Sequence, residues 1–118
     1  MLKPGTKLTQ MQPQAALAMA LALDTYRAFG LSGVVTSCYR VGAEQLLHST
    51  GCAFDLRLPS RCGGHPNLSP AQLDEAVVTA VRDALGGVRP GSDFDVVLER
   101  FSADPSNDHV HIEYDPKS

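Results

Sequence analysis

The chain lacks the cysteine spacing that marks a disulfide framework or a thiolate zinc site. It has 118 residues and three cysteines, Cys38, Cys52 and Cys62, and no two of them form a C-x-x-C pair. An odd number without paired spacing argues against a disulfide-stapled fold and against zinc held by sulfur. We therefore expect reduced thiols in a protein made in the cytosol.

The chain also lacks a cluster of basic residues. Its 10 Lys and Arg residues are scattered among 13 Asp and Glu residues, and the net charge is -3. Surfaces that bind phosphate backbones are usually basic. We therefore expect no nucleic-acid partner.

The apolar run AALAMALAL, Ala15–Leu23, is too short to span a membrane, because a transmembrane helix needs about 20 apolar residues. It follows Lys3 and Lys7, as the apolar core of a signal peptide follows basic residues. However, the pattern continues into Asp24 and stops at Gly30, as an amphipathic helix would. We therefore expect neither a signal peptide nor stable insertion into a membrane.

The composition is typical of one globular domain. Apolar residues make up 43% of the chain, and its length is sufficient for one hydrophobic core. Residues 1–12 contain Pro4, Gly5 and several polar residues, and they predict a loosely held N-terminal arm. Residues 13–118 are predicted to form a single domain, which we expect to be a monomer.

Two helices are predicted from capping residues and apolar spacing. The first runs from about Pro13 to Phe29 and ends at Gly30, and its alanine and leucine content favours a buried helix. The second begins with a capping box formed by Ser69 and Gln72 and ends at Gly86. Its expected apolar stripe comprises Leu73, Ala76, Val77, Ala80, Val81 and Leu85.

Four strands are predicted over residues 33–40, 53–58, 94–100 and 109–114. In the second and fourth, apolar residues alternate with polar ones, among them Asp55, His109 and His111. The order helix, strand, strand, helix, strand, strand predicts an α+β domain. We expect a four-stranded antiparallel sheet with helices packed on one face. The polar residues, and with them a zinc site, would then lie on the open face.

Three of the four histidines fall in two motifs, HSTGCAFD (His48 to Asp55) and HVH (His109 to His111). Zinc accepts nitrogen and oxygen ligands, and a catalytic site uses three protein ligands and one water. His48, Asp55 and His111 would make such a set for one zinc ion, and Gly51 would let the loop turn tightly. The alternative interpretation is a set of surface histidines in loops and at a sheet edge.

Other polar residues near these motifs have plainer interpretations. Arg57, Glu99 and Glu113 are either exposed charges on an open sheet or groups that orient the metal ligands. His65 follows Gly63 and Gly64 and is interpreted as a solvated loop residue.

The motifs together resemble those of the zinc peptidases that cut bacterial wall peptides. The pattern is S-x-Y-R (Ser37, Tyr39, Arg40), then H-x-x-G-x-A-x-D, then D-H-V-H (Asp108 to His111). That family includes D-alanyl-D-alanine carboxypeptidases, dipeptidases and phage L-alanyl-D-glutamate endopeptidases. It shares a fold with lysostaphin-type peptidases and the hedgehog signalling domain. The resemblance spans roughly Leu8 to Lys117, and the closing run is similar to small phage and prophage members.

The resemblance implies a role for each matched residue. His48, Asp55 and His111 match the zinc ligands of the family. Arg40 matches the arginine that steadies the substrate carbonyl as negative charge develops on it. His109 matches the first histidine of H-x-H in the lysostaphin-like branch, where it assists the transition state.

The general base has two candidates. Asp108, three residues before His111, matches the acidic base of the family's D/E-x-x-H pattern. In a regular strand, however, Asp108 would point away from His109 and His111. Asp108 can therefore act as the base only if it lies at the bent start of the strand; otherwise His109 is the better candidate.

The function implied by the resemblance is zinc-dependent hydrolysis of peptidoglycan stem peptides by a phage or prophage lytic enzyme. The L-Ala–D-Glu and D-Ala–diaminopimelate bonds are both open as targets. Without a signal peptide, delivery to the wall would depend on a membrane pore or on carriage in a phage particle. Two alternatives remain: an inactive zinc-bearing binding module, and a structural component of a phage tail.

Overall fold

The computed structural model describes residues 13–40, 52–86, 94–100 and 104–114. Its helices are α1 (Pro13–Ala28) and α2 (Pro70–Ala84), with two short 3-10 helices, η1 (Pro59–Arg61) and η2 (Pro105–Asn107). Its strands are β1 (Val35–Arg40), β2 (Cys52–Arg57), β3 (Phe94–Glu99) and β4 (His109–Tyr114). The predicted bounds differ from these by two residues at most. The predicted arm, residues 1–12, lies outside the described part of the chain.

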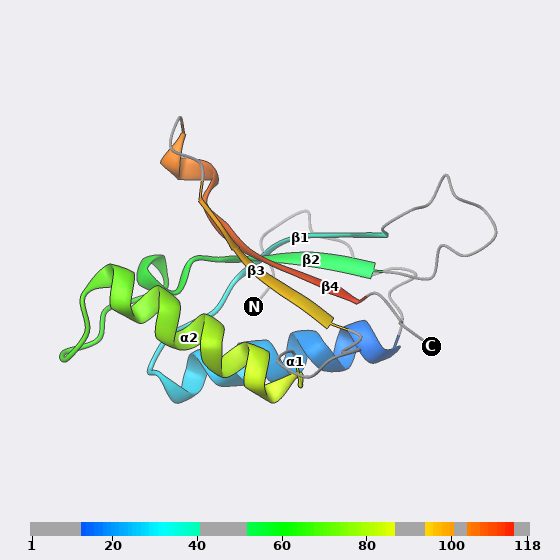
Figure 1. Cartoon of the computed structure of the whole chain (residues 1–118), viewed down its shortest axis with the longest axis horizontal. Coiled ribbons are helices and arrows are strands. Elements are labelled where there is room, and N and C mark those ends of the chain that lie inside the picture. The colour runs from blue at the N-terminus through cyan, green and yellow to red at the C-terminus, as the bar shows by residue number, and fades with distance from the viewer. Residues whose placement is uncertain (1–12, 41–51, 87–93, 101–103, 115–118) are drawn as a thin grey trace.

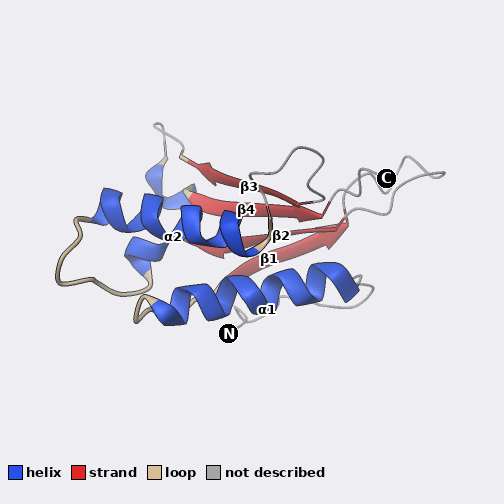
Figure 2. Ribbon diagram, turned by 60° about the horizontal axis from the view of Figure 1, so that its bottom comes forward, coloured by secondary structure: helices blue, strands red, loops and turns tan. Residues whose placement is uncertain are grey.

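The four strands form one antiparallel sheet in the order β1-β2-β4-β3. Figures 1 and 2 show α1 and α2 side by side against one face of this sheet. The predicted α+β class, with helices packed on a four-stranded antiparallel sheet, is confirmed. Within the described residues, neither helix is long and apolar enough to cross a membrane.

The ends of the helices follow the predicted capping chemistry. The Ser69 hydroxyl accepts a hydrogen bond from the Gln72 backbone N–H at 3.2 Å, and the Gln72 side chain accepts one from the Ser69 N–H at 2.9 Å. Gly30 and Gly86 follow the two helices with φ of 77° and 70°. These left-handed conformations favour glycine because it has no Cβ.

The hydrophobic core lies between the sheet and the two helices. Its fully buried members include Tyr26, Phe54, Leu56, Leu73, Val77, Val78, Val81, Val110 and Ile112. Val78 was not part of the predicted stripe of α2, while Ala76 and Ala80 of that stripe are only half-buried. The prediction of a buried first helix holds for one side of α1 only, since Leu17 on the other side is 62% exposed.

Alternation along β2 and β4 decides which residues can form a site. Phe54 and Leu56 of β2, and Val110 and Ile112 of β4, face the helices and are at most 1% exposed. Successive side chains of a strand point to opposite faces. The intervening polar residues therefore lie on the face of the sheet that no described helix covers.

Two buried polar groups hold the loop that follows β2. The Tyr26 hydroxyl donates to the Arg57 carbonyl oxygen at 2.8 Å. The Asp74 carboxylate, in a residue only 4% exposed, accepts hydrogen bonds from the Ser60 N–H at 2.8 Å and from its hydroxyl at 3.1 Å. Arg100 lies 3.5 Å from the same carboxylate. These bonds join the end of β2 to α1 and join η1 to α2.

Candidate metal centre

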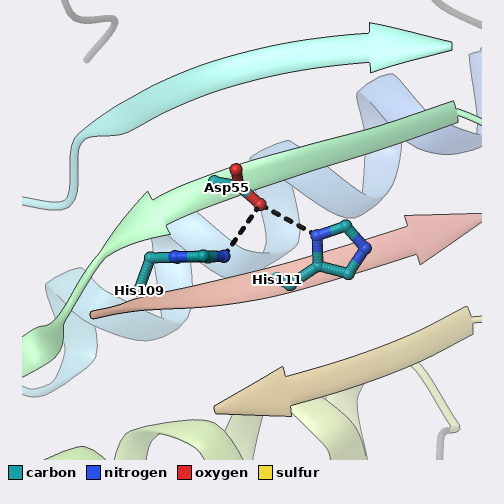
Figure 3. Close-up of side chains that lie close together, drawn as sticks. All are labelled: Asp55, His109 and His111. Atoms are coloured by element: carbon teal, nitrogen blue, oxygen red, sulfur yellow. Dashed lines mark hydrogen bonds and ion pairs between the residues drawn. The ribbon is translucent and has the colours of Figure 1, made fainter. Parts of the chain in front are cut away.

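Asp55, His109 and His111 come together on the open face of the sheet (Figure 3). The Asp55 Oδ1 atom lies 2.9 Å from Nδ1 of His111 and 3.5 Å from Nε2 of His109. One ligand atom from each residue lies within 4.8 Å of the other two. The three side chains are partly exposed, so an ion can reach them from solvent.

The donor set fits a zinc ion. Bonds of about 2.0 to 2.1 Å in a tetrahedral arrangement place ligand atoms about 3.3 Å apart. The distances of 2.9 and 3.5 Å from Asp55 to the two rings bracket that value. Two imidazole nitrogens and one carboxylate oxygen also match the ligands that zinc accepts. The cluster could therefore hold a metal ion.

Each histidine ring is oriented by an acceptor on its other nitrogen, as is usual for metal-binding histidines. The His109 Nδ1 atom lies 2.8 Å from the Asn107 carbonyl oxygen, which can only accept. Nδ1 therefore carries a hydrogen. The Nε2 atom faces the cluster and also lies 3.2 Å from Glu99 Oε2. In His111 the two nitrogens have exchanged places relative to His109. Its Nδ1 atom faces Asp55, and its Nε2 atom lies 3.3 Å from Glu113 Oε1.

The protonation of His111 depends on its two acidic neighbours. The hydrogen bond to Asp55 is the largest cause that raises the pKa of His111 to about 9, against the opposing effect of burial, and Glu113 adds to the rise. Burial tends to raise the pKa of Asp55, but hydrogen bonds from His111 and Ser37 outweigh it and hold that pKa below its usual value. A metal ion must therefore displace a proton from His111 at neutral pH.

Hydrogen bonds from β1 and η2 hold the cluster in place. The Ser37 hydroxyl donates to Asp55 Oδ2 at 2.7 Å, which leaves Oδ1 directed at the histidines. The Asp104 carboxylate accepts hydrogen bonds from the Ser106 N–H at 3.2 Å and from the Asn107 amide at 3.0 Å. These bonds shape the turn whose Asn107 carbonyl orients His109.

A polar depression of about 560 Å³ adjoins the cluster. Asp55 and His109 of the cluster line it together with residues 106–108. Asp108 lies directly after η2 and before the first residue of β4, so it is not part of the regular strand. It is half-buried and lines the same depression as Asp55 and His109. Asp108 thus meets the condition stated for it in the sequence analysis, a place outside the regular part of the strand.

The predicted site residues are only partly covered by the structure. Asp55 and His111 meet as expected, and His109, which the resemblance assigns to catalysis, lies among the candidate ligands. His48 lies outside the described residues, and so does the side chain of Arg40, whose backbone ends β1.

Sequence reasoning gave no role to Ser37 or Asn107. The contact of Ser37 follows from its place opposite Asp55 in the pairing of β1 with β2. The contact of Asn107 depends on the η2 turn. The sequence predicts a turn-rich loop over Ser102 to Asn107, but it does not predict the direction of the Asn107 carbonyl.

Comparisons of the chain with protein-family models, curated proteins and solved structures find no match.

Proposed function

We propose that the protein is a zinc-dependent peptidase that hydrolyses peptide bonds in peptidoglycan stem peptides. The observation that carries this proposal is the meeting of Asp55 with His109 and His111 beside a depression that Asp108 also lines. A metal centre next to a carboxylate and an accessible pocket is the minimum that metal-assisted hydrolysis requires. The choice of wall peptides as substrates, and of a phage or prophage lytic role, rests on the motif resemblance.

Two ligand sets are compatible with this proposal. In one, Asp55, His109 and His111 hold the ion, and a water molecule completes the tetrahedral site. In the other, which the resemblance implies, His48 is the third ligand and His109 is left to stabilise the transition state. Both sets share Asp55 and His111, whose contact of 2.9 Å is shorter than that of Asp55 with His109, 3.5 Å.

The described residues suit the individual steps of peptide hydrolysis. A zinc ion bound here would supply a water molecule with a pKa near neutrality and would polarise the carbonyl of the scissile bond. Asp108 accepts the proton of the attacking water and passes it to the leaving amine. Where it is not a ligand, His109 donates a hydrogen bond from Nε2 to the oxygen on which negative charge develops. The resemblance assigns the same role to Arg40, whose side chain lies outside the described residues.

The test is hydrolysis of purified wall muropeptides, followed by mass spectrometry, with the zinc content of each protein sample measured. We expect about one zinc ion per chain and defined fragments for the wild type, and the fragment masses will identify the bond that is cut. Asp108→Asn should keep its zinc and lose at least about 100-fold in kcat, as expected for removal of a general base. Zinc binding without cleavage of any muropeptide would instead support a binding module, and absence of zinc would refute the metal centre.

A further inference from the structure

Two arginines, Arg57 and Arg61, line the depression next to the metal cluster. Arg57 shares the open face of β2 with Asp55 and pairs directly with His109 of β4 in the register of the sheet. Cross-strand partners have Cβ atoms about 5 Å apart, so Arg57 begins beside a candidate metal ligand. Arg61 is the last residue of η1, four positions further along the chain.

The backbones that carry the two arginines are held by the buried polar groups described above. The carbonyl of Arg57 accepts the Tyr26 hydroxyl at 2.8 Å, and its N–H donates to the Val34 carbonyl at 2.9 Å. Arg61 follows Ser60, which Asp74 binds through two hydrogen bonds. Fixed backbones reduce the conformational entropy that the arginines lose when they bind a ligand.

The charges in the depression favour an anionic ligand once the metal is bound. Among the lining residues, Asp55 and Asp108 balance the charges of the two arginines, so a divalent ion at the cluster would make the depression positive. Glu99 and Glu113 contact His109 and His111 but do not line the depression. Both arginines are exposed, and no hydrogen bond or ion pair joins the Arg57 guanidinium to a described residue. A planar guanidinium matches a carboxylate with two parallel hydrogen bonds.

We propose that Arg57 and Arg61 form a subsite for a free carboxylate of the substrate, next to the bond that is cut. This inference rests on the proposed function and specifies its substrate as a peptide with an ionised carboxyl group near the scissile amide. In a stem peptide that contains L-lysine, that group is either the α-carboxylate of D-glutamate or the carboxylate of the C-terminal residue. A peptide in which the relevant carboxyl group is amidated would lose its partner in this subsite.

The test uses three forms of the tripeptide L-Ala-γ-D-Glu-L-Lys: the free acid, the form with the D-glutamate α-carboxyl amidated, and the form with the C-terminus amidated. KM and kcat are measured on the zinc-loaded chain, and binding is measured by calorimetry on the zinc-loaded Asp108→Asn variant, which should bind the peptides with little cleavage. The variants are Arg57→Gln and Arg61→Gln. Arg27→Gln is the matched control, because Arg27 is exposed on α1 and paired with Asp24.

We expect the free acid to bind about 10-fold more tightly than one of the amidated forms, as a charge-assisted hydrogen bond allows. The form that binds weakly identifies the carboxylate. Arg57→Gln and Arg61→Gln should abolish this preference and raise KM more than they lower kcat, while Arg27→Gln should retain it. Equal binding of all three forms, or a preference that survives Arg57→Gln, would overturn the subsite.

The two proposals can fail separately in this experiment. Cleavage of all three peptides at equal rates would support a peptidase and refute the carboxylate subsite. Binding that depends on Arg57 and on a free carboxylate, without cleavage of any peptide or muropeptide, would support the subsite and refute the peptidase.

Discussion

Asp55 and His111 are 56 positions apart in the chain, yet they lie directly opposite each other on β2 and β4, with Oδ1 and Nδ1 2.9 Å apart. The antiparallel register brings them together, and the alternation of each strand directs both side chains to the open face (Figure 3). A slip of one residue in either strand would turn that side chain toward the helices. The buried residues of β2 and β4 that pack in the core therefore also determine the geometry of the candidate metal centre.

Loss of either of these residues should abolish metal binding. Wild-type protein dialysed against zinc and then against buffer should retain about one ion per chain. Asp55→Ala and His111→Ala should retain little, because each removes a ligand common to both ligand sets. Excess zinc at about 100 times its Kd should stabilise the wild type by about 2.7 kcal/mol and should leave the two variants unaffected.

His65→Ala is the matched control for this experiment. His65 lies in the loop between η1 and α2, where its Nδ1 atom accepts from the Asn67 N–H at 3.2 Å, and it is not part of the cluster. Its loss should leave the zinc content and the thermal shift unchanged. Equal loss of zinc in His65→Ala and His111→Ala would show that the ion binds elsewhere.

The third ligand can be identified by comparing His48→Ala with His109→Ala. If Asp55, His109 and His111 are the ligands, His109→Ala loses zinc and His48→Ala keeps it. If His48, Asp55 and His111 are the ligands, as the resemblance implies, His48→Ala loses zinc, while His109→Ala keeps zinc and loses activity. Zinc content measured alongside muropeptide cleavage separates the two outcomes. Retention of zinc by both single variants would contradict each set.

The sequence predicted the fold because its signals were local. The capping box at Ser69, the glycine at position 30 and the alternation in residues 109–114 each act within a few residues, and each is confirmed. The strand order β1-β2-β4-β3 was not predicted. It depends on packing between segments that are distant in the chain, which periodicity alone does not encode.

The candidate site was predictable only where strand alternation controls it. Asp55 and His111 could be placed on one face because each alternates with apolar residues along its strand, and the structure brings them together. The orientation of His109 depends instead on the Asn107 carbonyl and thus on the η2 turn. The contribution of Asp74 was also missed, because its partner Ser60 lies 14 positions away across a loop.

The metal-free protein should be most stable in mildly acidic solution. The pKa of His111 is raised from 6.5 to about 9, so its contribution is complete below pH 6.5 and is lost as the pH rises through about 9. The pKa of Asp55 is lowered from 3.8, so its contribution is present above pH 3.8 and is lost at lower pH. Thermal unfolding in EDTA from pH 3 to pH 10 should therefore show a maximum between about pH 4 and 6.5.

The His111→Asn variant tests the alkaline side of this profile. It should lose the decline between pH 6.5 and 9, whereas His65→Ala should retain it. The zinc affinity of the wild type should rise over the pH range in which the stability of the metal-free protein falls. It should rise up to about pH 9, because the ion competes with a proton for His111. A zinc affinity independent of pH between 6 and 9 would be incompatible with a protonated His111 in the free protein.

Replacement of Asp74 should destabilise the fold because it leaves partly buried donors without their acceptor. Asp74→Ala leaves the Ser60 N–H and hydroxyl, and also Arg100, without their acceptor. The expected loss is about 1 to 3 kcal/mol in the free energy of unfolding, measured by urea denaturation. Asp83→Ala, an exposed residue on the same helix, should change it by no more than about 0.5 kcal/mol. A similar effect of both variants would mean that the Ser60 contacts contribute nothing.

Asp104 should influence the metal centre through the turn that orients His109. Its carboxylate binds Ser106 and Asn107, and the Asn107 carbonyl in turn holds Nδ1 of His109. Asp104→Ala should therefore lower zinc affinity or kcat by about 10-fold, as loss of an orienting group near a metal typically does.

The ring tautomer of His109 distinguishes this orienting role from general destabilisation. Nitrogen NMR should show the wild-type ring with its hydrogen on Nδ1 and the Asp104→Ala ring as a mixture of both tautomers. Asp24→Ala, an exposed carboxylate on α1, should leave the tautomer unchanged. If Asp104→Ala shifts the urea midpoint but not the tautomer, the turn stabilises the fold without orienting His109, and the effect on zinc would need another cause.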